Sequence, residues 1–154
     1  MSDDTLEKAQ ALFSQGMQDL EHARYLAAEQ KFTQSLELIP NRLSTMTNLV
    51  VVQLKQGEID RADNLINKIL LIYPNDDLIN FYKGTVLRLR DDLEGALKYF
   101  DLAITINPHN AVVFVEKSLV LLQQQRVAEA TLCLDKALKL DADNAQALLA
   151  LAQV

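Results

Sequence analysis

The sequence has no tryptophan, one cysteine, three prolines and four glycines among its 154 residues. A single cysteine, Cys133, cannot form a disulfide within the chain. The scarcity of glycine and proline argues against a turn-rich all-β protein and against a low-complexity, disordered chain. No run of about 18 apolar residues occurs, so we expect no transmembrane helix.

The chain also lacks an excess of basic residues. It has 15 Lys and Arg against 21 Asp and Glu, which gives a net charge of -6. Nucleic acids and anionic membranes are bound through clustered Lys and Arg, so we expect neither as a partner. Residues 1–8 are acidic and polar, unlike a secretory signal, and we expect a cytoplasmic protein.

Recognisable catalytic motifs are missing as well. The sequence contains no phosphate-binding glycine loop, no nucleophile-elbow serine motif and no zinc-binding histidine pair on a helix. His22 and His109 fall at expected helix boundaries, which is typical of exposed capping or turn residues. Cys133 has no His or Asp at a recognisable spacing and is expected to be a structural thiol. We therefore expect no enzyme, no cofactor and no metal site.

What the sequence does contain is a period of 34 residues. A small residue, a large one, a second small one and a closing residue recur at this spacing. The four copies are Ala28, Phe32, Ser35 and Pro40; Ala62, Ile66, Ile69 and Pro74; Ala96, Phe100, Ala103 and Pro108; and Ala130, Leu134, Ala137 and Ala142. Self-similarity at such a period is the signature of a repeat architecture.

Apolar residues at helical spacing predict two helices in each period. The predicted helices are residues 5–21, 26–39, 43–56, 59–73, 76–90, 93–106, 109–124 and 127–140, followed by a terminal helix at 145–154. Asn41 is expected to cap the third helix. Each helix is too short to be stable alone, so neighbours must stack to bury their apolar faces. We predict one continuous array over residues 1–154, with repeats at about 9–42, 43–76, 77–110 and 111–144.

This recurring pattern of small, large and closing residues resembles the tetratricopeptide repeat over essentially the whole chain. The family's small-residue place in the first helix of each pair is filled by Gly16, Val50, Gly84 and Ser118. The resemblance implies an all-α, right-handed superhelical solenoid of antiparallel helix pairs, with about four repeats plus a terminal helix. Val50 and Ile69 are bulky where small residues are usual, so we expect the second pair to splay.

The resemblance also implies a binding surface, because the first helix of each pair lines the concave face in this family. The candidate partner-binding residues on that face are Phe13, Met17, Asn48, Val51, Leu78, Phe81, Tyr82, Val115 and Leu119. Most are apolar, and an exposed apolar groove usually marks an interaction site. We predict a noncatalytic scaffold that binds an apolar peptide or helix. The alternative for each residue is that it packs against a neighbouring helix as core.

One known function of the family is not expected here. A subset holds the C-terminal carboxylate of chaperones with a clamp of Lys, Asn, Asn, Lys and Arg. The matching places in this chain are Phe13, Met17, Asn48, Leu78 and Tyr82, so only the second Asn is kept. Without the cations, charge-assisted capture of a carboxylate is not supported.

Residues 145–154 carry no charge and are mostly Ala, Leu and Val. Terminal repeats of solenoids normally present a polar outer face. We therefore expect that the polypeptide continues, or that this helix pairs with another chain in a homodimer; a short amphipathic capping helix is the alternative. If the polypeptide continues, the array is expected to be the N-terminal docking region of a larger enzyme of methyltransferase or glycosyltransferase type.

Overall fold

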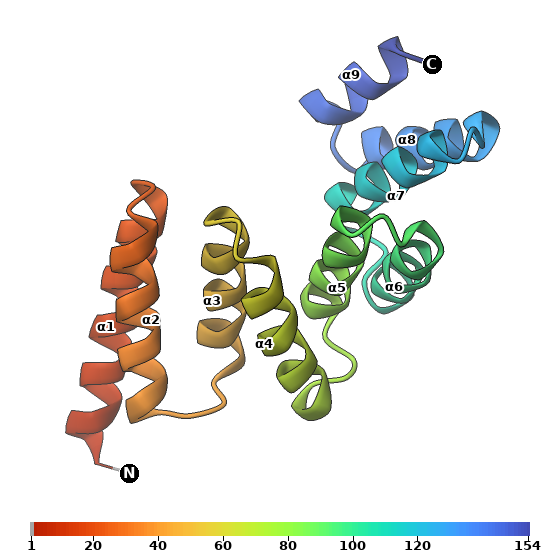
Figure 1. Ribbon diagram of the computed structural model, residues 1–154. Coiled ribbons are helices and arrows are strands. Elements are labelled where there is room, and N and C mark those ends of the chain that lie inside the picture. The colour runs from red at the N-terminus through yellow and green to blue at the C-terminus, as the bar shows by residue number, and fades with distance from the viewer. Residues whose placement is uncertain (1) are drawn as a thin grey trace. The chain divides into compact units, whose positions relative to one another are not determined.

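The computed structural model describes residues 2–154, which form nine α-helices and contain no strand (Figure 1). The helices divide between two compact units, one ending at Pro74 and one beginning at Asn75. The predicted fold class is confirmed, because consecutive helices pack as antiparallel pairs in an all-α repeat fold. The single array over residues 1–154 stays a prediction.

The first unit contains α1 (Asp3–Glu21), α2 (Tyr25–Leu38), α3 (Leu43–Lys55) and α4 (Ile59–Ile72). α1 begins two residues earlier than predicted, because the Ser2 hydroxyl accepts a hydrogen bond from the Thr5 amide at 3.2 Å. Along the chain, α1 packs on α2, α2 on α3 and α3 on α4.

The prediction that Asn41 caps α3 was wrong. Asn41 adopts a left-handed backbone with φ of 62°, which asparagine tolerates better than most residues. Its carbonyl oxygen accepts a hydrogen bond from the Tyr73 hydroxyl at 2.7 Å. Arg42 holds the cap position instead, without a side-chain hydrogen bond to the helix. Asn41 therefore turns the chain between α2 and α3 and ties that turn to the end of α4.

The second unit contains α5 (Asp77–Leu89), α6 (Leu93–Ile106), α7 (Ala111–Gln123), α8 (Val127–Leu140) and α9 (Ala145–Ala152). α6 and α8 have the predicted bounds. α7 begins two residues later than predicted, because the Asn110 side chain caps it through the Val112 amide. Side-chain caps also start α5, α6 and α9, at Asp76, Asp92 and Asn144.

Every helix pair turns through a left-handed residue at the same place in the period. These residues are Ala23, Gly57, Asp91 and Gln125, with φ of 57°, 75°, 63° and 60°. In the first turn the Arg24 amide bonds to the Asp19 carbonyl at 2.8 Å, and the other three turns contain the same backbone bond. This is the Schellman ending of a helix. Only one of the four residues is glycine, so the other three adopt a backbone that disfavours a side chain.

The two helices of a pair approach most closely where a glycine faces a phenylalanine. A Cβ on Gly16 would lie 2.7 Å from the Phe32 ring, and a Cβ on Gly84 would lie 2.6 Å from the Phe100 ring. In the second pair the same two places hold Val50 and Ile66, both fully buried. α3 and α4 contact each other less than the two helices of any other pair, in keeping with this bulkier side chain.

Buried apolar clusters hold each unit together. In the first unit Phe32 packs with Ala28, Leu49 and Val52, which joins α2 to α3. The second unit has one cluster around Phe100 and another that joins α7, α8 and α9. Burying one phenylalanine side chain fully contributes about 1.5–3 kcal/mol, so these rings are major stabilising elements of the pairs.

Candidate functional site

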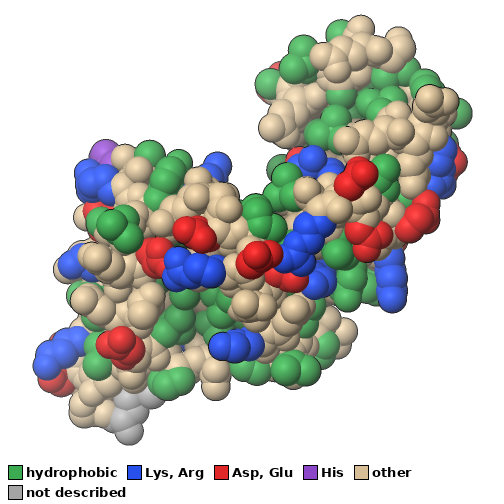
Figure 2. Space-filling model, in the orientation of Figure 1, with side chains coloured by type: hydrophobic (Ala, Val, Ile, Leu, Met, Phe, Trp, Pro, Cys, Tyr) green, Lys and Arg blue, Asp and Glu red, His purple; other side chains and the backbone are tan. Residues whose placement is uncertain are grey.

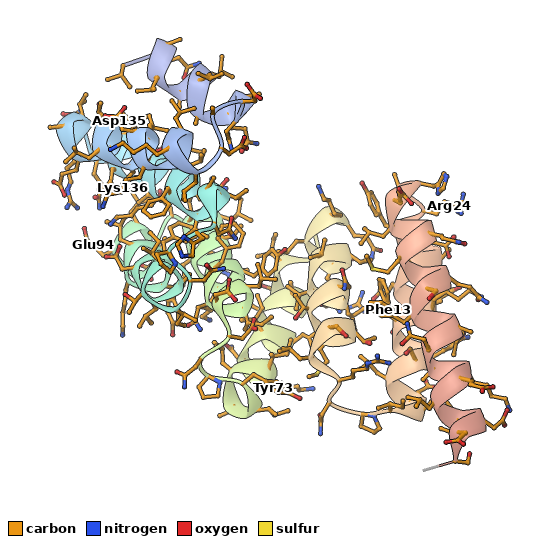
Figure 3. The ribbon with its side chains drawn as sticks, turned by 180° about the vertical axis from the view of Figure 1, so that it is seen from behind. Phe13, Arg24, Tyr73, Glu94, Asp135 and Lys136 are labelled. Carbon is orange, nitrogen blue, oxygen red and sulfur yellow. The ribbon has the colours of Figure 1, made fainter. Side chains whose placement is uncertain are left out.

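The candidate residues of the first unit lie on α1 and α3. Met17 is 38% exposed, whereas Phe13, Asn48 and Val51 are half-buried. The Phe13 ring lies 5.9 Å from the Phe32 ring, and the Arg42 guanidinium lies 5.9 Å from the Phe13 ring centre. Phe13, labelled in Figure 3, thus contacts both a core ring and a cation from the start of α3.

The rest of this first-unit face is polar. Arg42 donates a hydrogen bond to the Gln10 side chain at 2.9 Å, and the Asn48 side-chain amide donates to the Ser44 carbonyl at 2.8 Å. Ser14 and Ser44 are exposed. Side-chain hydrogen bonds therefore satisfy much of this surface, and it offers only a small apolar area around Met17.

The second unit presents a more apolar face. Its first helices are neighbours, since α5 contacts α7 and α7 contacts α9. Leu78 on α5 is 38% exposed, Val112 on α7 is 43% exposed and Leu149 on α9 is 63% exposed. Tyr82 on α5 and Leu119 on α7 are half-buried, and burial raises the pKa of the Tyr82 phenol. A hollow of about 160 Å³ lies between α7 and α9, beside Leu119 and Leu149.

Two of the nine candidate residues are core instead of surface. Phe81 is 9% exposed, with its ring centre 5.8 Å from that of Phe100 and 5.2 Å from that of Tyr82. Val115 has no exposed surface and belongs to the cluster that joins α7, α8 and α9. Phe81 packs against residues of α6 and α7, and Val115 packs against residues of α8 and α9, so neighbouring helices cover both side chains. The structure corrects the prediction at these two positions.

An ion pair joins two charged side chains of α5 and α7 in the second unit. Glu116 of α7 lies 3.1 Å from Arg88 of α5, measured from Oε2 to Nε. The two side chains are only 15% and 25% exposed. The two atoms are close but poorly aligned for a hydrogen bond, and both are shielded from water. This pair links α5 to α7 and leaves the apolar side chains around it as the dominant feature.

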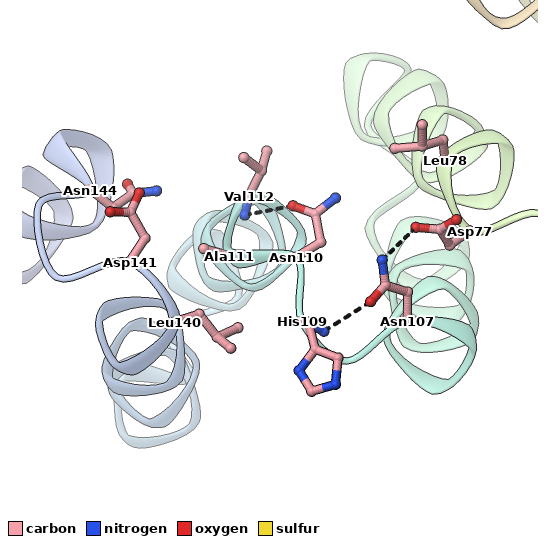
Figure 4. Close-up of a pocket in the computed structure, with 10 residues that line it drawn as sticks. All are labelled: Asp77, Leu78, Asn107, His109, Asn110, Ala111, Val112, Leu140, Asp141 and Asn144. Carbon is pink, nitrogen blue, oxygen red and sulfur yellow. Dashed lines mark hydrogen bonds between the residues drawn. The ribbon is translucent and has the colours of Figure 1, made fainter. Parts of the chain in front are cut away.

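A larger hollow, of about 530 Å³, opens where the inter-repeat loops of the second unit meet (Figure 4). Its polar groups bond to one another. Asn107 donates to the Asp77 carboxylate at 3.0 Å, and the His109 amide donates to the Asn107 side-chain oxygen at 3.1 Å. These hydrogen bonds hold the helix starts and the loop in place. The polar groups of this hollow therefore have a structural role.

The histidines and the cysteine have the structural roles predicted for them. His22 and His109 are exposed, and Nδ1 of His22 lies 2.8 Å from the Gln18 carbonyl oxygen at the end of α1. Cys133 is buried, and this burial raises the pKa of its thiol, which disfavours the reactive thiolate. No group of His, Cys, Asp and Glu side chains able to hold a metal occurs within residues 2–154.

Two further observations concern the charge on one face and the apolar character of the helices. On the face shown in Figure 2, acidic and basic side chains are interspersed, and no large patch of one sign stands out. Among the helices of residues 2–154, none is both long enough and apolar enough to cross a membrane.

The sequence reasoning missed Leu149. The signal was available, because Leu149 stands one period after Val115 and two after Phe81. Extending the register by one more helix places it at the position that Phe81 holds on α5 and Val115 holds on α7. It is exposed where those two are buried, because it lies on α9, the last helix of the unit.

Comparison with known proteins agrees with the resemblance seen in the sequence. Two models of the family described as tetratricopeptide repeat match the chain, over residues 19–80 and 115–154. No curated protein matches the chain.

Many solved structures share the fold. PilF from Pseudomonas aeruginosa is 24% identical with a TM-score of 0.86, over 98% of this chain and 69% of that protein. A tetratricopeptide repeat protein from Parabacteroides merdae ATCC 43184 is 18% identical with a TM-score of 0.73; the match covers 93% of this chain but only 57% of that protein. YrrB, described as having an unusual peptide-binding site, is 22% identical with a TM-score of 0.73, over 96% of this chain and 75% of that protein. At such identities these structures show the fold alone.

Proposed function

Because the chain belongs to the tetratricopeptide repeat family, we propose that it is a noncatalytic protein-interaction scaffold. In this proposal an apolar peptide or helix binds the face formed by α5, α7 and α9. The observation that carries the proposal is the exposure of Leu78, Val112 and Leu149 on neighbouring first helices of one unit. The exposed Met17 and the half-buried Phe13, Asn48 and Val51 of the first unit are proposed as a second, more polar contact surface.

The physical argument is one of desolvation. An exposed apolar patch on neighbouring helices gains free energy when a partner removes it from water. An amphipathic helix or extended segment with large apolar side chains can cover such a surface. The Glu116–Arg88 pair lowers the cost of this covering, since neither charge has to be buried without a partner.

One solved relative supports the proposal by analogy. YrrB has the same fold and is described as having an unusual peptide-binding site. That description applies to YrrB, and it shows that a scaffold of this type can bind a peptide. A cytoplasmic location for the present chain stays a prediction from its sequence.

The proposal can be tested with a displayed library of random 12-residue peptides. Selection on the wild-type protein is expected to enrich peptides with large apolar side chains. The dissociation constant of a selected peptide is then measured by fluorescence anisotropy for wild type and for Leu78→Ser/Val112→Ser. Both residues are exposed, so the variant is expected to fold. Losing two partly exposed apolar contacts should weaken binding by about tenfold or more.

Ser44→Ala is the matched control, because Ser44 stands one period before Leu78 and is exposed in the first unit. It should bind the selected peptide as wild type does. Enrichment of peptides without apolar side chains, or equal affinity of wild type and the double variant, would refute the proposal.

Self-assembly is a second candidate, favoured by the outer surface of α9. Leu148 and Leu149 are 50% and 63% exposed on this short helix. A homodimer through α9 would bury both. Light scattering over a wide concentration range should then show a dimer in wild type and a monomer in Leu148→Glu; a wild-type monomer throughout would exclude the homodimer. The alternative of an enzyme's N-terminal docking region stays a prediction, which the full gene length would test.

A further inference from the structure

The second unit contains an apolar hollow that lies outside the proposed peptide-binding face. It has a volume of about 410 Å³ and is lined by residues of α6, α7, α8 and the loop between α6 and α7. Ile104, Pro108, Phe114 and Leu140 provide its apolar lining. Phe114 is 6% exposed and anchored in the core, whereas Leu140 is 40% exposed at the edge. The hollow is thus a preformed apolar surface that water can reach.

Two lysines of α8 stand beside this lining. Lys136 and Lys139 are three residues apart on one side of the helix, and both are exposed. The Lys136 ammonium lies 5.8 Å from the centre of the Phe114 ring, which holds it over the apolar surface. Neither lysine forms an ion pair with a carboxylate of residues 2–154. Two cations without a carboxylate partner therefore stand at one apolar hollow, although the chain has a net charge of -6.

The same places in the first unit have different chemistry. Two periods earlier, Lys68 replaces Lys136, but Leu71 replaces Lys139 and Met46 replaces Phe114. Leu71 is 87% exposed. The combination of an aromatic floor and two lysines is therefore a property of the second unit and does not follow from the repeat pattern.

We propose that this hollow binds a segment of a partner protein in which a large apolar side chain lies beside carboxylates. The apolar side chain enters between Phe114 and Leu140, and the carboxylates meet Lys136 and Lys139. The opposite charges attract more strongly beside an apolar wall than in open water, because the wall lowers the local dielectric constant. The exposed mouth suits a side chain carried by a peptide, since a long acyl chain needs an enclosed cavity.

This hollow adjoins the proposed peptide-binding face, since Leu140 and His109 also line the larger hollow that reaches Leu78 and Val112, but its apolar floor and its lysines are not part of that face. Its lining comes from α6, from α8 and from the α7 side chain Phe114, which packs toward the second helices. The peptide-binding face uses Leu78, Val112 and Leu149. Variants of the hollow and variants of the peptide-binding face therefore test the two proposals separately, and a failure of one can be told from a failure of the other.

The probe is a blocked five-residue peptide, Gly-Glu-Phe-Glu-Gly. Gly-Gln-Phe-Gln-Gly lacks its charges, and Gly-Glu-Ala-Glu-Gly lacks its apolar side chain. Titrations followed by ¹H–¹⁵N correlation spectra should show shifts at residues 104–109 and 136–140. The probe should bind about tenfold more tightly than either comparison peptide, and added salt should weaken its binding.

Three variants test the assignment. Lys136→Glu/Lys139→Glu should weaken probe binding by about tenfold or more, because it replaces two attractions by two repulsions. Leu140→Ser should weaken it by about threefold through the lost apolar contact. Lys68→Glu makes the matched change in the first unit and should leave binding unchanged. Circular dichroism checks that all three remain folded.

Several results would overturn the proposal. Equal affinity for the uncharged peptide would remove the role of the lysines, and equal affinity for the alanine peptide would remove that of the hollow. Shifts at Leu78, Val112 and Leu149 in place of the hollow would assign the probe to the other face. Self-association that competes with the probe and is lost in the double lysine variant would identify a second copy of this chain as the occupant.

Discussion

The two units follow the same helix plan but present different surfaces. In the first unit the exposed first-helix positions include Gln10 and Ser44, whereas the second unit exposes Leu78 and Val112 at the equivalent register. The packing positions differ much less, since Phe32 and Phe100 are both fully buried against a glycine. The 34-residue period therefore constrains the residues of the core, whereas the residues on the outer face of each helix can differ between the units.

The largest expected effect on stability comes from a valine at Gly84, where a glycine of the second unit packs against a phenylalanine. Valine is the residue that the second helix pair of the first unit has at this place, as Val50. Gly84→Val places a side chain within 2.6 Å of the Phe100 ring, which is fully buried and cannot move freely. We expect a loss of about 2–3 kcal/mol in the free energy of unfolding, measured with urea.

The double variant Gly84→Val/Phe100→Ile tests the reason for that loss. It recreates the Val50 and Ile66 combination of the first unit, in which both side chains are fully buried. The smaller second side chain should make the double variant more stable than Gly84→Val alone. A double variant as unstable as the sum of its single variants would show that the two positions are not coupled.

A smaller effect is expected where the units differ in a nearly buried charge. Glu29 of α2 is 8% exposed, pairs with Arg61 and accepts a hydrogen bond from Gln56 at 2.9 Å. Two periods later the same place holds Leu97, which is buried in an apolar cluster. Glu29→Ala should lower the free energy of unfolding, measured by thermal denaturation, by about 1–2 kcal/mol, because it leaves polar groups without their partner.

A double-mutant cycle measures how much of the effect of Glu29 comes from its ion pair with Arg61. Since the Arg61 side chain is 53% exposed, its coupling to Glu29 should be no more than about 1 kcal/mol. Additive effects of Glu29→Ala and Arg61→Ala would show that the carboxylate acts through Gln56 alone.

The turns offer a third comparison, within the first unit. Ala23 and Gly57 occupy the same left-handed position in successive pairs. Ala23→Gly should raise the free energy of unfolding by about 0.5–1 kcal/mol, because glycine relieves the backbone strain. Gly57→Ala should lower it by a similar amount. Denaturation midpoints that move in the same direction for both variants would contradict this account.

The smallest effect concerns Tyr82, which stands two periods after Ser14. Burial raises the pKa of its phenol, so the folded state favours the neutral form. Its contribution to stability is fully present below the unfolded pKa of about 10 and is lost as the pH rises through the folded pKa. Absorbance titration should show a late-ionising phenol in wild type that is absent from Tyr82→Phe. Titration curves that differ by a phenol of ordinary pKa would rule out this burial effect.

Most of the architecture could be predicted from local signals. The bounds of α6 and α8 were correct, because Asp92 and Arg126 precede the helices and Asn107 and Asp141 end them. Asn41 was misassigned because asparagine is favoured both at helix caps and in left-handed turns, and only the contact with Tyr73 distinguishes the two. The site was predicted less well, since Phe81 and Leu78 are both apolar residues of the same helix.

By itself, the sequence determined the 34-residue period, the helix pairs and the packing of small against large residues, because these depend on nearby residues and on a repeated pattern. Tertiary structure decided which apolar side chains of α5 and α7 stay exposed, because that depends on which side α6 and α8 cover. It also decided that Lys136 lies over Phe114. These two residues belong to different helices, and no spacing in the sequence brings an ammonium group to the face of an aromatic ring.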